Sequence, residues 1–232
     1  MTGLIKMYCY RSFRQLGLYI IWAIIAVMML VDSMLVDEKT VSTILTETGS
    51  FAYLLSSVLT GVFFCADNTS GFIKNYAGSV SDRSVIAVAR AVTALMIGTL
   101  TICFTVICAF LLTFNIGDAQ LTVVFTGCLF LTTIGTSFIA LLVSELFRKT
   151  VPVVITTIAI SSGLVCELIG TITAMITDSK FILHEYCVTG MFKLYSNSLE
   201  QADAARLVIV SLIYIAVTFA ACVFSIKKRD VV

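Results

Sequence analysis

The residue best placed to do chemistry in this sequence is a carboxylate inside a long apolar stretch. Glu167 lies in the run from Val151 to Ile176. A charged side chain at the centre of a membrane helix costs about 3 kcal/mol or more, so it usually has a partner or a function. At about 1.5 Å per residue, Glu167 lies roughly 24 Å along a helix that starts at Val151, in the outer third of a bilayer. The only basic residue expected near that depth is Arg206.

Small hydroxyl residues surround this carboxylate in the sequence. With Glu167 they form a candidate lumen or gate, made of Ser161, Ser162, Glu167 and Thr171. Small and polar side chains on one helix can line a path, and they also allow helices to pack closely. The alternative is a carboxyl group that is neutralised by its neighbours or that reaches the outer surface.

Other kinds of chemistry find little support. His184 is the only histidine, and no CxxC pair is present, so the sequence predicts no metal site. Of the eight cysteines, only Cys187 is expected outside, without an obvious partner, and we interpret all eight as small membrane-core residues. An intramembrane enzyme needs paired carboxylates, a Ser/His pair or a metal cluster, whereas this chain offers Glu167 alone. We therefore expect no catalytic residue.

Composition indicates the elements that must position these residues. The 232 residues are 59% hydrophobic and 12% charged, with a mean hydropathy of +1.04. A soluble domain carries roughly twice that charged fraction. A helix needs about 20 apolar residues to cross the hydrocarbon, and six stretches qualify, at about 16–36, 50–66, 87–114, 121–143, 151–176 and 205–226. The sequence predicts an all-α integral membrane protein with one transmembrane domain, 1–232.

Charge placement predicts the orientation of these six helices. With both termini in the cytoplasm, the inner segments hold 11 Lys and Arg residues and the outer segments hold 4. This asymmetry follows the positive-inside rule.

Two flanking segments have patterns of their own. In residues 1–15 and the first residue of the following span, an apolar arc opposes Lys6, Arg11 and Arg14, and it consists of Ile5, Tyr8, Cys9, Phe13 and Leu16. This predicts an interfacial amphipathic helix, although a cationic tail that only sets topology is the alternative. The outer loop 177–204 is apolar enough to pack against the outer ends of the helices, and Ser198 to Gln201 has the spacing of a capping box for the last helix.

The inner loop 67–86 carries the most informative pattern. Asp67 and Asn68 can cap a short helix whose apolar face holds Phe72, Ile73 and Tyr76. Such a helix is suited to docking in a groove of another protein. The alternative is an ordinary turn between two membrane helices.

This loop resembles that of type-2 ABC exporter permeases. The segment GFIKNYAGSVSDRSVIAVARAV has the Gly, Lys-Asn and spaced Arg residues of that family at Gly71, Lys74, Asn75, Arg83 and Arg90. The plan of six spans, both ends inside and a long outer loop before the last span is also similar. The resemblance implies a permease subunit whose inner loop couples to a separate ATPase. The implied coupling residues are Asp67, Asn68, Gly71, Phe72, Ile73, Lys74, Tyr76, Asp82 and Arg83.

Several expectations about partners follow from the resemblance. No GxxxxGK[ST] loop is present, so ATP and Mg would be bound by two copies of a partner ATPase. A second copy of this chain, or a related permease, would complete the translocation path. The expected activity is export of a hydrophobic or amphipathic substrate, such as an antimicrobial peptide or lipid, across a bacterial plasma membrane.

Other classes of membrane protein remain as alternatives. A non-transporting membrane assembly or immunity subunit could have the same topology. A channel or secondary transporter usually shows internal repeats or helices broken by Pro or Gly. We find no repeat, and Pro152 lies at a helix start, where proline is tolerated.

Overall fold

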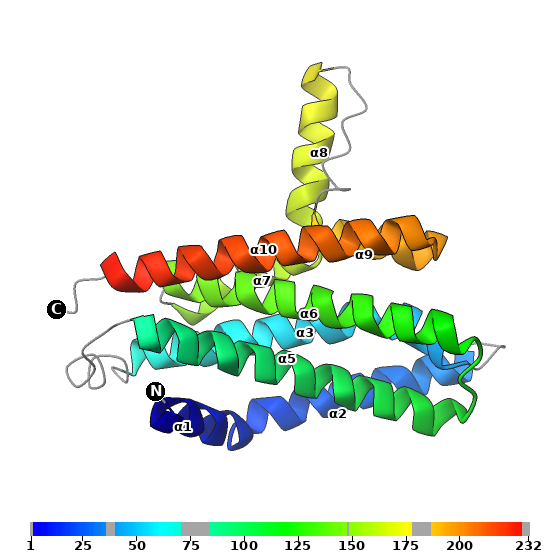
Figure 1. The fold of residues 1–232 in the computed structure, drawn as a ribbon, viewed down its shortest axis with the longest axis horizontal. Helices are drawn as coiled ribbons and strands as arrows, with labels where there is room; N and C mark the ends of the chain where they lie inside the picture. The colour runs from blue at the N-terminus through cyan, green and yellow to red at the C-terminus, as the bar shows by residue number, and fades with distance from the viewer. Residues whose placement is uncertain (1, 36–39, 71–83, 148, 178–186, 229–232) are drawn as a thin grey trace.

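The regular structure of this chain is helical, as expected for long apolar segments. In a bilayer, backbone N–H and C=O groups must be satisfied within the segment, which an α-helix achieves. The computed structural model describes residues 2–35, 40–70, 84–147, 149–177 and 187–228 (Figure 1). Within these residues every regular element is an α-helix. The predicted all-α class is therefore confirmed.

Five of the described helices are long and apolar enough to cross a membrane. They are α2 (Leu16–Leu35), α3 (Val41–Thr69), α5 (Ser84–Thr113), α6 (Ala119–Phe147) and α10 (Gln201–Lys228). A sixth span exists only if α7 (Thr150–Ser161) and α8 (Leu164–Thr177) are counted as one, and their axes are bent by 62°. The fifth predicted span, 151–176, is therefore not a straight helix.

Two helices form the centre of the bundle. In the most apolar part of α3 and α6, 61% and 67% of residues are buried, against 22% in α2 and in α10. The four helices α3, α5, α6 and α10 run side by side in Figure 1, with α2 on the opposite side of the bundle from α10. The hydrophobic core therefore lies around α3 and α6.

Helix α3 is longer than the predicted span 50–66. It begins after Thr40, whose Oγ1 accepts a hydrogen bond from the Thr43 N–H at 3.3 Å. It continues to Thr69, so Asp67 and Asn68 lie in its last turn instead of capping a separate helix. The physical reason is that both side chains find partners on neighbouring helices. The described loop boundaries are accordingly Ser70 and Ser84.

The first helix, α1 (Thr2–Phe13), packs into the bundle against α5. Its buried face is formed by Leu4, Tyr8 and Ser12, whereas Phe13 is 43% exposed. The predicted apolar arc was therefore wrong in part. Tyr8 sets the orientation, because its ring packs against the rings of both Phe63 and Phe64 at 6.3 Å.

Helix α7 packs along a ridge of α3 that is formed by every fourth residue, about one per turn. The first contact is at Cys65, whose Sγ lies 3.8 Å from Thr150 Oγ1. One turn on, Gly61 lies against α7, since a methyl group there would be 3.0 Å from Val153. At the next turn the hydroxyls of Ser57 and Ser161 are 2.8 Å apart. Helix α7 thus follows the ridge from the Thr69 end of α3 to its middle.

The same ridge continues under α9 (Val188–Ser198) and not under α8. The Tyr53 and Phe192 rings lie 5.5 Å apart, and a methyl group at Gly49 would be 3.6 Å from Phe192. The buried residues of α9 include Val188, Thr189, Gly190, Met191, Phe192 and Tyr195. The prediction that the outer segment packs against the helices is confirmed for α9. Helix α9 thus packs mainly against α10 and α6, and its Phe192 reaches the ridge of α3.

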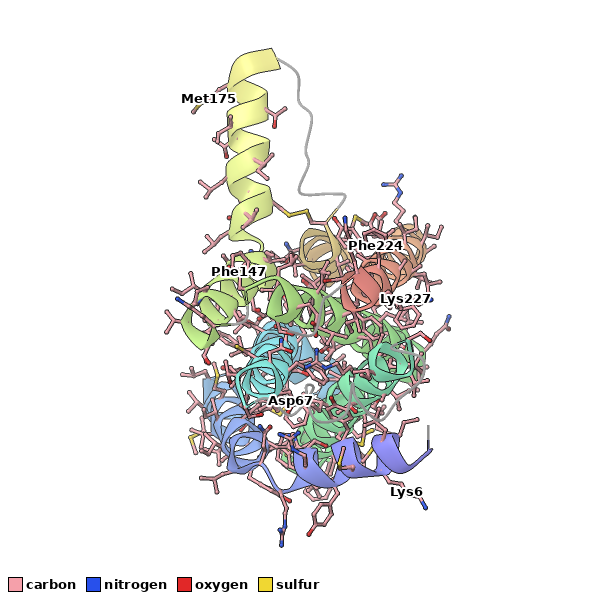
Figure 2. All side chains as sticks on the ribbon, turned by 90° about the vertical axis from the view of Figure 1, so that its left-hand side faces the viewer. Lys6, Asp67, Phe147, Met175, Phe224 and Lys227 are labelled. Carbon is pink, nitrogen blue, oxygen red and sulfur yellow. A yellow bond between two sulfur atoms is a disulfide. The ribbon has the colours of Figure 1, made fainter. Side chains whose placement is uncertain are left out.

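Helix α8 leaves the bundle between these two helices. Figures 1 and 2 show it standing away from the other elements, with Met175 toward its far end. The break occurs at Gly163, whose φ of +82° is a left-handed conformation that favours glycine. None of the described side chains of α8 is buried.

The start of the last helix also differs from the predicted capping box. Ser198 is the last residue of α9, and Leu199 follows in the left-handed conformation with a φ of +55°. Helix α10 then begins at Gln201. Ser198 instead binds Asp203, with 2.8 Å between its hydroxyl and Oδ2.

Candidate functional site

Charged and polar side chains from four helices meet at one end of the bundle. We call this group the ionic cluster, and it consists of Tyr8 and Arg11 of α1, Asp67 and Asn68 of α3, Arg90 of α5, and Glu145 of α6. Figure 2 views the bundle from this end and shows Asp67 near its middle. The cluster adjoins Ser70 and Ser84, the described residues on either side of segment 71–83.

Arg90 is the centre of the cluster. Its guanidinium forms an ion pair with Glu145, and both side chains are fully buried. Its Nη2 also donates to Asn68 Oδ1 at 3.0 Å and to the Phe64 carbonyl at 3.3 Å. The guanidinium lies 5.1 Å from the Phe64 ring centroid. Arg90 therefore connects α5 to both α3 and α6.

A second ion pair connects α1 to α3. Arg11 Nη2 lies 2.6 Å from Asp67 Oδ1, and the Asp67 side chain is fully buried while that of Arg11 is 33% exposed. Asn68 adds a bond to α6, since its Nδ2 donates to the Ser144 carbonyl at 2.8 Å. The last turn of α3 is thus tied to α1, α5 and α6.

Tyr8 contributes an uncharged hydroxyl to this group. Burial raises the pKa of Tyr8 above its usual value of 10.0, while the nearby Arg90 charge acts in the opposite direction. A phenol with a raised pKa stays protonated at neutral pH and can donate a hydrogen bond. The cluster therefore contains two cations and two carboxylates with a neutral phenol beside them.

This arrangement is suited to holding helices in a fixed relation. Buried ion pairs give little net stability, but they are costly to break once formed, because a single buried charge is left behind. A displacement of the end of α3 would therefore also move α1, α5 and α6. Within the described residues, no three His, Cys, Asp or Glu side chains are arranged to hold a metal ion.

A second polar group lies where α8 leaves the bundle. Glu167 is in the first turn of α8, and its Oε1 is 3.1 Å from Lys193 Nζ of α9. Arg206 is not its partner, because Arg206 lies 3.9 Å from Asp203. The expectation that Arg206 would be the only basic residue near Glu167 was wrong, because α8 bends away and places Glu167 beside Lys193 of α9.

A disulfide bond joins the same two helices. Cys166 of α8 is bonded to Cys187, the residue that precedes α9. The interpretation of all eight cysteines as membrane-core residues was therefore wrong for this pair. Cys166 was assigned to a straight fifth span, and the bend at Gly163 brings it to Cys187.

The predicted lumen residues do not converge on one point. Ser161 is buried and faces Ser57, whereas Ser162 lies between α7 and α8 and donates to the Ala159 carbonyl at 3.2 Å. Thr171 is exposed on α8 and donates to the Glu167 carbonyl at 2.8 Å. Only Glu167 has a charged partner from another helix.

Most of the predicted coupling residues fall in a segment that is not described. Gly71, Phe72, Ile73, Lys74, Tyr76, Asp82 and Arg83 lie outside the described residues. Asp67 and Asn68 are described, and they belong to the ionic cluster. The hypothesis of a coupling helix in this loop therefore stays a prediction.

Sequence reasoning missed most of the ionic cluster. Arg90 was used only as an indicator of the inner side and as a position of the family motif, Arg11 only for the charge placement and the charged face of the first helix, and Glu145 was not considered. The sequence did indicate this contact, however, because Asp67, Arg90 and Glu145 each lie within two helical turns of the predicted cytoplasmic surface of the membrane. Since ionisable groups in membrane helices usually pair, two carboxylates and an arginine at one depth indicate such a contact.

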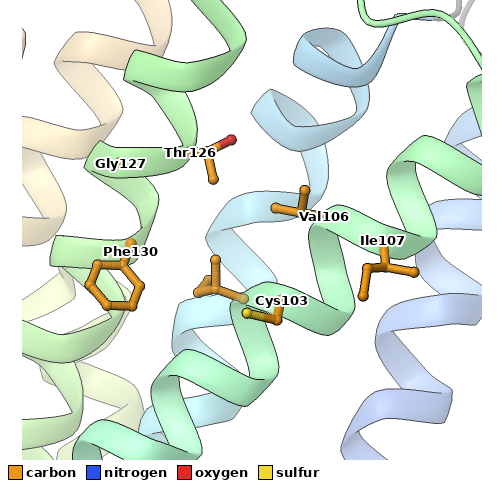
Figure 3. A pocket seen from close by; sticks show the side chains of 7 residues that line it. Cys103, Val106, Ile107, Thr126, Gly127 and Phe130 are labelled. Atoms are coloured by element: carbon orange, nitrogen blue, oxygen red, sulfur yellow. The ribbon is translucent and has the colours of Figure 1, made fainter.

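An open apolar groove lies between α5 and α6 (Figure 3). Its volume is about 410 Å³. A side chain at Gly127 would meet nothing within 4 Å, which shows how open the groove is. Its lining residues are Ile102, Cys103, Val106, Ile107, Thr126, Gly127 and Phe130. None carries a charge, so the groove is suited to aliphatic groups.

The fold and these sites define a membrane-embedded helical bundle with a buried ionic cluster at one end. No family model matches the sequence, and no curated protein is similar to it.

Proposed function

We propose that this chain is the transmembrane permease subunit of an ATP-driven ABC exporter in a bacterial plasma membrane. Both termini face the cytoplasm in this proposal, and segment 71–83 contacts a separate ATPase. Two copies of the permease and two of the ATPase form the transporter. ATP and Mg bind to the ATPase subunits.

The observation that carries the proposal is the ionic cluster at the end of α3. A permease driven by another subunit needs a mechanical connection between its inner loop and its helices. Ion pairs and hydrogen bonds tie the last turn of α3 to α1, α5 and α6. Movement of segment 71–83 therefore reaches four helices together.

The mechanism is alternating access. ATP binding draws the ATPase subunits together, segment 71–83 moves with them, and the helical halves rock to open a path outward. The ionic cluster keeps the inner ends of the helices in register during this movement. The apolar surface of the bundle favours hydrophobic or amphipathic cargo, such as a peptide or lipid.

The proposal is tested by affinity purification of the tagged chain from native membranes. Wild type is expected to copurify with an ATPase and with ATP hydrolysis. The triple substitution Phe72→Ala, Ile73→Ala and Tyr76→Ala is expected to lose both. The control is Phe114→Ala with Ile116→Ala, which removes exposed apolar side chains near the opposite end of α5. If intact wild type brings down no ATPase, the proposal fails.

One observation favours a second candidate, an ion-coupled secondary transporter. The segment formed by α7 and α8 is broken at Gly163, and discontinuous helices occur at the binding sites of such transporters. Asp67 and Glu145 are also buried carboxylates. This candidate predicts that the folded chain purifies without an ATPase.

A further inference from the structure

Helices α7, α8 and α9 together contain more helical residues than one crossing of the membrane needs. Helix α7 has 12 residues and α9 has 11. At 1.5 Å per residue they reach about 34 Å in all, close to the roughly 30 Å of hydrocarbon. Helix α7 packs along α3, and α9 packs against α6 and α10 with its Phe192 on the same ridge of α3, so α7 and α9 can complete the fifth crossing without α8.

Helix α8 is left as an arm. Its 14 residues extend about 21 Å from the break. Its exposed apolar side chains are Leu164, Leu168, Ile169, Ile172 and Met175, at 48–80% exposure. A soluble protein rarely exposes an apolar surface of this extent to water. Lipid or another protein must therefore cover the arm.

The base of the arm argues against lipid. Glu167 and Lys193 are 47% and 45% exposed, and charged groups facing hydrocarbon are costly. The disulfide between Cys166 and Cys187 and this ion pair also hold α8 at its base. A binding surface that is already fixed in position loses less conformational freedom on association. An apolar arm with a polar base is suited to a protein partner.

We propose that α8 is the dimerisation arm, and that its partner is the same surface of a second copy of this chain. A two-fold interface brings each residue of a patch against another residue of the same patch. This patch carries one carboxylate and one ammonium, so two copies can pair Glu167 with Lys193 in both directions. The apolar side chains of the two arms then cover each other. The inference deepens the proposed function, since it rests on a path shared by two permeases.

Photo-crosslinking in native membranes tests the location of the interface. A benzoylphenylalanine at Met175 is expected to give covalent dimers under ultraviolet light. The same probe at Val217 of α10, which is 61% exposed, is expected to give none. Dimers from position 217 and not from 175 would overturn the inference, as would the absence of dimers from both.

Substitutions to alanine test how much the apolar side chains of α8 contribute to association of two copies. Leu168→Ala, Ile172→Ala and Met175→Ala together are expected to weaken association in liposomes at least tenfold, measured by single-molecule photobleaching. The matched control is Ile209→Ala, Ile213→Ala and Val217→Ala, which removes exposed side chains of similar spacing from α10. Equal association of the two triple variants would contradict the role of α8.

Charge reversal separates pairing between copies from pairing within one copy. Glu167→Lys and Lys193→Glu each place like charges within a chain and between identical chains. A mixture of the two variants restores opposite charges only between different chains, so mixed dimers are expected to exceed dimers of either variant. Random mixing would refute the inference. None of these readouts involves an ATPase, so this proposal and the proposed function can fail independently.

Discussion

At the scale of single residues, the most consequential group is Arg90. Its guanidinium is fully buried and forms its ion pair with Glu145 of another helix. Removing one member of such a pair costs about 3–5 kcal/mol, whereas replacing both with apolar groups is often neutral. The main effect of the pair is thus to fix how α5 and α6 pack together, and its net contribution to stability is small.

Glu145→Gln is expected to lower the free energy of unfolding by about 3–5 kcal/mol, because Arg90 would be buried without that carboxylate. The double substitution Arg90→Met with Glu145→Leu is expected to recover most of this loss. Unfolding in mixed micelles, analysed as a double-mutant cycle, measures the coupling. Additive effects of the two sites would show that the ion pair is not formed.

Two arginines of α1 give a matched comparison. Arg11 pairs with buried Asp67, whereas Arg14 is exposed, with its guanidinium 5.0 Å from the Tyr10 ring centroid. Arg11→Gln is expected to destabilise the protein by about 1–3 kcal/mol, since a charged hydrogen bond to a buried group is lost. Arg14→Gln is expected to change stability by about 0.5 kcal/mol or less. Equal thermal midpoints would argue that α1 is not tied to α3.

At the scale of elements, the break between α7 and α8 explains why the sequence was only partly informative. Hydropathy detects the run 151–176 as one span, because it measures composition and not direction. The bend depends on Gly163, and glycine is common in membrane helices. The pairing of Cys166 with Cys187 then depends on that bend. The long helices α2, α3, α5, α6 and α10 were predictable because each is apolar over a full membrane thickness.

Polar contacts between helices were harder to predict for a different reason. Asp67 and Asn68 have the local pattern of caps, and only the proximity of α1, α5 and α6 keeps them inside α3. Similarly, Leu4 in α1 is not part of the predicted apolar arc, yet it is buried in the bundle. Local sequence patterns do not include the partners that tertiary structure supplies.

Two glycines test the break. Gly163→Ala is expected to destabilise the protein by about 1–2 kcal/mol, because an alanine is strained at a φ of +82°. Gly127→Ala lies inside α6 in open space and is expected to be neutral or stabilising by about 0.5–1 kcal/mol. Thermal unfolding of the two variants in the same detergent checks this. A neutral Gly163→Ala would mean that α7 and α8 can form a continuous helix.

The disulfide closes a loop with a sequence separation of 21 residues. Cys166→Ser with Cys187→Ser is expected to lower the free energy of unfolding by about 3 kcal/mol, by the loop-entropy account. A reducing agent should lower wild type to the level of this variant and leave the variant unchanged. Cys103→Ser, at a free and exposed thiol, is the control. Identical stability of wild type with and without reductant would contradict the bond.

At the scale of the whole molecule, two regions of the bundle have different roles in our proposal. The ionic cluster joins four helices at the end next to segment 71–83. The corner of α8 and α9 presents an apolar arm and an exposed ion pair. The end of the bundle at the ionic cluster is thus suited to receiving movement from an ATPase, and the corner of α8 and α9 to contact with a second permease.

The most direct measurement of the central claim is native mass spectrometry of the wild-type chain, tagged and purified from its own membranes in mild detergent. We predict a complex that contains two copies of this chain and two copies of an ATPase, with ATP hydrolysis in the same fraction. A folded chain that is isolated with no nucleotide-hydrolysing subunit, with or without added ATP and Mg, would contradict the account.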